Sequence, residues 1–97
     1  MAAPKHTDRA ALERRWRERG FSCELWTDPP GQVWTDFVHQ VDELLMVVEG
    51  ELEIQIAGKR MRPASGEEIL IPAGALHTVR NVGGATARWL YGYRSRT

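Results

Sequence analysis

The segment GEEILIPAGALHTVRN, from Gly66 to Asn81, is the stretch around which the rest of the chain is organised. Its central run of isoleucine, leucine and isoleucine is typical of a short buried β-strand. Pro72 and Gly74 end that run, because proline lacks the N–H that a sheet ladder needs and glycine permits the positive φ of a tight turn. The segment therefore predicts a strand, a turn and a returning strand that begins at His77.

The spacing within this segment is a glycine, five residues, Pro-x-Gly, two residues, a histidine, three residues and an asparagine. Gly66, Pro72, Gly74, His77 and Asn81 match it without a gap. In this spacing the segment resembles the second motif of the cupin superfamily. The resemblance implies that a first motif lies upstream.

The first cupin motif reads glycine, five residues, His-x-His, three or four residues, glutamate, six residues, glycine. Gly31, Phe37, His39, Glu43 and Gly50 hold this register, with Phe37 where the family has its first histidine. Fifteen residues, 51 to 65, separate the two motifs, a short spacer like that of small microbial cupins. The resemblance implies an all-β fold, a cupin-type double-stranded β-helix or RmlC-like jelly-roll barrel, with one short N-terminal helix.

In cupins, histidine and glutamate side chains of the two motifs bind one divalent metal. The resemblance implies a metal site at His39, Glu43 and His77, so that the family's four ligands become three. Two imidazoles and one carboxylate suit iron, manganese, nickel or zinc, and leave positions open for water and substrate. Two alternatives remain open. The presence of Phe37 indicates that metal binding has been lost, or the motif register shifts by one residue and Asp42 supplies the carboxylate.

Glu43 is also the candidate catalytic residue of a site without metal. Burial would raise its pKa, and its proton would pass to His39 or His77. A small molecule is the expected ligand in either case. The predicted pocket walls are Thr35, Phe37, Trp89, Tyr91 and Arg94.

The composition indicates one small domain. The chain has 97 residues, 42% of them hydrophobic, and its 13 basic and 13 acidic residues give a formal net charge of zero. This balance argues against nucleic acid or an anionic membrane as partner. With a single cysteine, Cys23, no internal disulfide can form, and the N-terminal residues lack the apolar core of a signal peptide. We expect a cytoplasmic protein.

The chain divides into a tail and helix, residues 1–20, and a barrel domain, residues 21–97. Thr7 or Asp8 is the expected helix cap and Gly20 the expected stop, after a loose terminus at residues 1–7. The helix is interpreted as a solvated one whose Trp16 docks on the barrel or on a partner subunit, in preference to an anion-binding arm. Strands are expected at 21–27, 33–38, 44–48, 52–56, 69–71 and 87–93, with others beginning at Met61 and His77.

The motif register of the resemblance implies that Phe37 and His39 lie inside the barrel. Alternation along residues 33–38 then points Trp34 and Val38 outward. Exposed side chains of this size predict a homodimer, in which a second subunit covers them. The rival interpretation is that Leu12 and Trp16 fold back over the same face.

Three functions are compatible with these features. The first is an enzyme, such as an oxygenase or isomerase, that activates a small oxygen-rich or aromatic molecule on the metal. The second is a non-catalytic binding module or sensor for a small ligand, without metal. The third is an interaction protein that uses only its outer surface. One fold carries all three, so the fold cannot choose among them.

Overall fold

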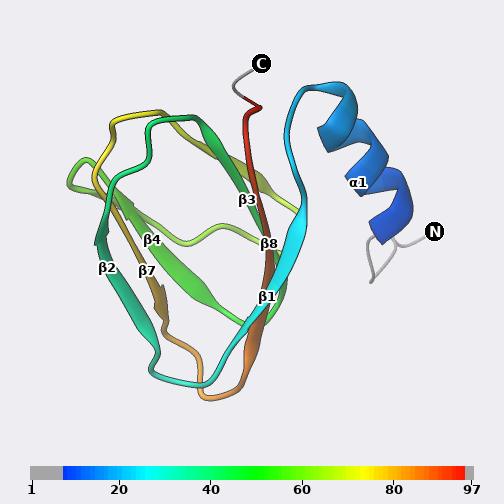
Figure 1. Cartoon of the computed structure of the whole chain (residues 1–97). Coiled ribbons are helices and arrows are strands. Elements are labelled where there is room, and N and C mark those ends of the chain that lie inside the picture. Colours follow the sequence, from blue (N-terminus) through cyan, green and yellow to red (C-terminus); the bar gives the residue numbers. More distant parts are fainter. Residues whose placement is uncertain (1–7, 96–97) are drawn as a thin grey trace.

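The computed structural model describes residues 8–95. Within this range eight strands form two four-stranded antiparallel sheets, in the orders β1-β8-β3-β6 and β2-β7-β4-β5, with one helix against the barrel (Figure 1). The elements are α1 (Arg9–Glu18), β1 (Glu24–Asp28), β2 (Val33–Phe37), β3 (Glu43–Glu49), β4 (Leu52–Ile56), β5 (Lys59–Met61), β6 (Glu68–Ile71), β7 (His77–Asn81) and β8 (Ala87–Tyr93). The predicted all-β jelly roll is confirmed.

Strand β3 holds the two halves of the apolar core together, because its side chains are buried on both faces. Leu45 and Val47 face the barrel interior, with Leu52, Ile54, Ile71, Val79, Ala87 and Trp89. Leu44 and Met46 face outward, where Leu12 and Trp16 of α1 cover them. The same cluster contains Phe21, Cys23 and, on β8, Leu90. The continuous apolar run of β3 is therefore explained by the two covers, the opposite sheet and the helix.

Helix α1 packs on the sheet of its own chain. Asp8 caps it by accepting a hydrogen bond from the Ala11 N–H at 3.1 Å; the other predicted cap, Thr7, and the predicted loose terminus lie outside the described residues. Trp16 is fully buried. Its indole N–H donates to Glu68 of β6, whose carboxylate also accepts two hydrogen bonds from Arg19 at 2.9 and 2.8 Å. The helix thus covers the sheet that contains β6, not the β2 face.

Strand β2 does not alternate as expected. Trp34 pairs with Val79 and Phe37 with His77, so three steps along β2 oppose two along β7, and Asp36 lies in the left-handed region with φ 58°. This β-bulge turns Trp34 and Phe37 to the same side of the sheet. The prediction that Trp34 points outward is therefore wrong, and Thr35, predicted to line the pocket, is exposed instead.

Within residues 8–95, no helix has the length and apolar character needed to cross a membrane.

Candidate metal centre and aromatic pocket

The proline-glycine turn after β6 is hydrogen-bonded to the loop between β2 and β3. The Gly74 N–H donates to the His39 carbonyl at 2.9 Å, and the Ala73 N–H donates to the Asp42 carboxylate at 2.8 Å. Gly74 has φ 82°, a conformation that a side chain would strain. These two bonds join the two predicted motifs, and so the loop that carries His39 lies beside the start of β7.

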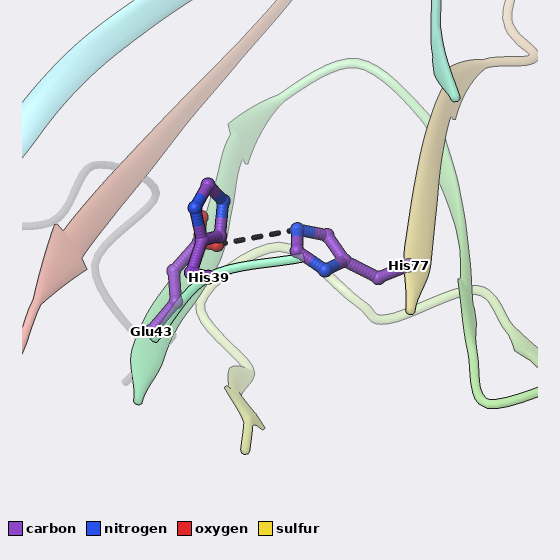
Figure 2. Close-up of side chains that lie close together, drawn as sticks. All are labelled: His39, Glu43 and His77. Atoms are coloured by element: carbon purple, nitrogen blue, oxygen red, sulfur yellow. Dashed lines mark ion pairs between the residues drawn. The ribbon is translucent and has the colours of Figure 1, made fainter. Parts of the chain in front are cut away.

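His39, Glu43 and His77 converge on one point, as Figure 2 shows. The Glu43 Oε1 atom lies 3.4 Å from the Nε2 atom of His39 and 3.4 Å from the Nε2 atom of His77. One potential ligand atom from each residue lies within 4.8 Å of the others. The spacing leaves room for one small cation among the three donors.

The Glu43 carboxylate is buried and its Oε1 atom has no hydrogen-bond partner, although both imidazoles are near. An ionised buried oxygen without a hydrogen-bond partner is unfavourable in free energy, so a positive charge beside it would stabilise the site. On the other side of the His77 ring, the Nδ1 atom lies 3.2 Å from the Ala75 carbonyl. A hydrogen on Nδ1 satisfies this contact, and the Nε2 lone pair then faces Glu43. The three donors therefore fit a divalent metal.

The pKa of His77 lies above its ordinary value of 6.5. The Glu43 carboxylate, within hydrogen-bonding distance of Nε2, is the main cause. The Ala75 carbonyl and the negative charge of Glu43 add to it, while burial opposes them. Without metal, a proton on His77 is thus the alternative source of the missing positive charge.

Tyr93 lies beside the cluster, with its hydroxyl 3.5 Å from the Nε2 atom of His39. Burial, and then the charges of Glu43 and Tyr91, raise the pKa of Tyr93 to about 12. The phenol therefore keeps its proton at neutral pH and is available as a hydrogen-bond donor at this end of the pocket.

A cavity of about 180 Å³ opens beside the cluster. The three candidate ligands form its polar end, and most of the remaining wall is aromatic. The other lining residues are Trp26, Trp34, Phe37, Val79, Trp89, Tyr91 and Tyr93. Such a cavity, largely apolar with a few convergent polar groups, is typical of a small-molecule site.

The structure brings most of the predicted site residues together. Phe37, Trp89 and Tyr91 line the cavity, whereas Thr35 does not. The alternative carboxylate, Asp42, bonds to the proline-glycine turn and to Arg94. Arg94, suggested as a wall, lies over the Phe21 ring instead, 4.6 Å from its centroid.

Sequence reasoning missed four wall residues, Trp26, Trp34, Val79 and Tyr93, and the buried carboxylate of Asp28. Trp34 was missed because the bulge in β2 has no clear sequence signature. Aspartate before two prolines is typical of the start of a turn, so the sequence around Asp28 does not indicate a buried carboxylate. The four tryptophans of this short chain are a usable signal of an aromatic site.

The fold and the cluster define a jelly-roll barrel with a candidate metal centre in its interior. The profile of the cupin domain family matches residues 24–93, which is well over half of the chain. The chain therefore belongs to the cupin family, as its two motifs indicated.

Solved structures with the same fold include known cupins. The Cupin_2 domain of an XRE family transcriptional regulator from Enterobacter cloacae has a TM-score of 0.72 at 20% identity, over 84% of this chain and 90% of that one. A cupin 2 conserved barrel domain protein from Salinispora arenicola has 0.70 at 19%, over 79% and 65%. At these identities the likeness is one of fold alone. TT1209 from Thermus thermophilus has 0.71 at 29%, over 79% and 74%.

One curated relative is a longer protein. The endoribonuclease YbeY of Myxococcus xanthus is 34% identical over 89 residues, which are 91% of this chain and 26% of that protein. The chain thus spans about a quarter of the length of the curated relative that it matches.

Proposed function

We propose that the chain binds one divalent transition metal through His39, Glu43 and His77, and a small molecule in the aromatic cavity beside it. The observation that carries the proposal is the buried Glu43 Oε1 atom, which has no hydrogen-bond partner and lies 3.4 Å from a nitrogen of each histidine. Three protein ligands are the usual number where a metal must also accept a substrate or water. Iron, manganese, nickel and zinc all suit this donor set.

A metal at this site would act as a Lewis acid toward an oxygen group of the ligand. Three groups of the chain would contribute around the metal. The Ala75 carbonyl orients the His77 ring, the aromatic walls keep water from the bound molecule, and Tyr93 offers a proton for a hydrogen bond. An oxygenase or isomerase activity is the narrower proposal, supported by the neutral Tyr93 phenol beside the ligand set.

A second candidate is proton transfer without metal. Glu43 would exchange a proton with His39 or His77, and both nitrogens lie 3.4 Å from its Oε1 atom. The raised pKa of His77 favours this proposal, because the Glu43 carboxylate stabilises the protonated ring. Metal analysis separates the two candidates.

We propose no ribonuclease site for this chain, although one relative is an endoribonuclease. Since the chain spans 26% of that protein, the endoribonuclease activity in its name is not proposed for this chain. The cavity supports this reading, because no lysine or arginine lines it among residues 8–95.

The test is metal content by mass spectrometry of protein produced in medium supplied with iron, manganese, nickel and zinc. We expect about one equivalent per chain, and loss of most of it, roughly tenfold or more in affinity, in His39→Ala, Glu43→Ala and His77→Ala. Asp42→Asn is the matched control, since it changes a neighbouring carboxylate outside the cluster and keeps an acceptor for Ala73. Phe37→His should tighten binding, whereas Phe37→Leu should not.

Wild-type protein without metal from such medium would contradict the metal proposal and leave proton transfer as the candidate. Full occupancy in all three alanine variants would show that the metal binds elsewhere.

A further inference from the structure

Three tryptophans direct their indole N–H groups to one buried carboxylate, that of Asp28. Trp26 donates to Oδ1 at 2.7 Å, Trp34 lies 3.1 Å from both oxygens, and Trp89 donates to Oδ2 at 3.1 Å. Only 1% of the Asp28 surface is exposed. The Asn81 side chain donates to the backbone carbonyls of Asp28 and Pro29, and so it fixes the loop that carries the carboxylate.

This arrangement decides which part of each indole meets the cavity. Asp28 is not a lining residue, whereas all three tryptophans are. Their N–H groups are therefore directed out of the cavity toward Asp28, and their carbon surfaces form its wall. Within residues 8–95, every hydrogen bond to the Asp28 carboxylate comes from an indole N–H. An ionised carboxylate accepts at both oxygens, so it can accept all of these bonds.

The rings form a nearly continuous wall. The centroids of Trp26 and Trp34 are 5.7 Å apart at 74°, and those of Trp26 and Tyr91 are 6.4 Å apart at 76°. Trp89 and Tyr93 continue the wall on either side of Tyr91, at 5.7 and 5.8 Å. In a crossed pair the edge of one ring points at the face of the other, an arrangement that aromatic side chains prefer.

A carboxylate is bonded to this wall. The Asp28 side chain lies at the N–H edges of three of the rings, and the Glu43 carboxylate, with His39 and His77 beside it, lies at the end of the same cavity. No lysine or arginine lines the cavity in the part of the chain that the structure describes. Indoles that donate to a carboxylate are richer in electrons, and their faces attract a cation whose water shell is weak, most of all an alkylated ammonium.

We propose that the aromatic wall binds the methylated ammonium group of a small molecule, and that Asp28 is the positioning residue that orients the three indoles. The inference rests on the proposed function only in placing the ligand in this cavity, and the wall requires no metal. Where a metal is bound by His39, Glu43 and His77, an anionic oxygen group of the ligand faces it. The favoured ligand class is therefore a small zwitterion with a methylated ammonium, of a size that about 180 Å³ can hold.

The test is titration of chelator-treated protein with choline and with 3,3-dimethylbutan-1-ol, its uncharged isostere, followed by NMR. We expect choline to saturate a single site, its methyl resonance to move upfield in the ring currents, and the isostere to bind about tenfold more weakly. Trp26→Leu should weaken choline binding by a similar factor. Leu25→Ala is the matched control, because Leu25 and Trp26 are neighbours on β1, are both 39% exposed, and only Trp26 lines the cavity.

Asp28→Asn tests the positioning role. An amide offers one acceptor oxygen and turns a donor N–H₂ toward an indole N–H, so three of the four indole resonances should move. The fourth, from Trp16, bonds to Glu68 and should stay in place. Choline affinity should fall along with the three shifts. If this variant does not fold, choline titration of Trp26→Leu still tests whether the aromatic wall binds the ammonium group, because the Trp26 side chain is half-exposed.

Equal affinity for choline and its isostere, or unchanged choline binding in Trp26→Leu, would overturn the inference. Metal content is measured on the same preparations before the chelator is added, so the two proposals fail separately. Metal without choline binding refutes the aromatic site alone, and choline binding without metal refutes the metal centre alone.

Discussion

At the scale of single residues, the decisive fact is that a carboxylate and two imidazoles share a buried space that lacks a positive charge. The pKa of His77 is raised, chiefly by Glu43, so a proton on this ring is one source of that charge. A metal would take the place of that proton at Nε2. Proton and metal therefore compete for one atom.

This competition gives opposite pH dependences. A pKa raised in the folded state adds stability that is fully present below the unfolded pKa of 6.5 and is lost as the pH rises through the folded pKa. We expect the His77 contribution to the free energy of unfolding of metal-free protein to fall as the pH rises above 6.5 through the folded pKa, while metal affinity rises. Urea unfolding and metal titration of wild type and His77→Gln, compared at each pH, measure both.

The quantity to compare is the difference in unfolding free energy between wild type and His77→Gln, because other ionisable groups contribute equally to both proteins. A difference in unfolding free energy that grows toward high pH would contradict the assignment of the raised pKa to His77.

At the scale of elements, close contact between β8 and the segment that leads from α1 into β1 holds the helix on the barrel. The Ser22 N–H donates to the Tyr93 carbonyl at 3.0 Å, and the Ser22 hydroxyl accepts from the Tyr93 N–H. Gly92, the residue before Tyr93, faces Ser22 and has no side chain. A Cβ there would lie 1.8 Å from the Ser22 carbonyl oxygen and 3.1 Å from the Trp16 ring.

Gly92→Ala should therefore separate the two segments and loosen the packing of Trp16. We expect a loss of about 2–4 kcal/mol in the free energy of unfolding, measured in urea, because neither backbone atom can move away alone. Gly84→Ala is the control, since nothing lies within 4 Å of a Cβ at that position. Equal stability of the two variants would show that this contact does not hold the helix in place.

At the scale of the whole molecule, the homodimer remains a prediction, with a changed basis. Trp34 no longer supports it, because the bulge turns that side chain into the cavity. Exposed apolar side chains on strands at the sheet edges support it instead. They are Leu25 on β1, Leu70 on β6 and Val33 on β2. Edge strands with such side chains are suited to pairing with a second copy.

We expect sedimentation equilibrium at about 50 µM to give twice the chain mass of 11.0 kDa. Leu25→Lys or Leu70→Lys should shift the equilibrium toward one chain, because a charge would be buried in the contact. Thr86→Lys, at an exposed turn position, controls for added charge. A wild-type mass near 11.0 kDa would refute the dimer.

The sequence by itself determined the fold, the strand order along the chain and the identity of the candidate ligands. It could do so because an apolar run ended by Pro72 and a turn that needs Gly74 are local patterns, and because the spacings to His39, Glu43 and His77 resemble the cupin motifs. The expected cap at Asp8 and stop at Gly20 also placed the helix within two residues of its observed bounds.

Only the tertiary structure decided the character of the cavity. A single extra residue in β2 turned Trp34 inward and left Thr35 exposed, and such a bulge depends on pairing with β7 and not on the local sequence. Likewise, Asp28 lies 61 residues from Trp89 and binds its indole only because β1 and β8 are neighbours. Contacts between distant residues form when sheets assemble, so no pattern along the chain could reveal that three tryptophans share one carboxylate.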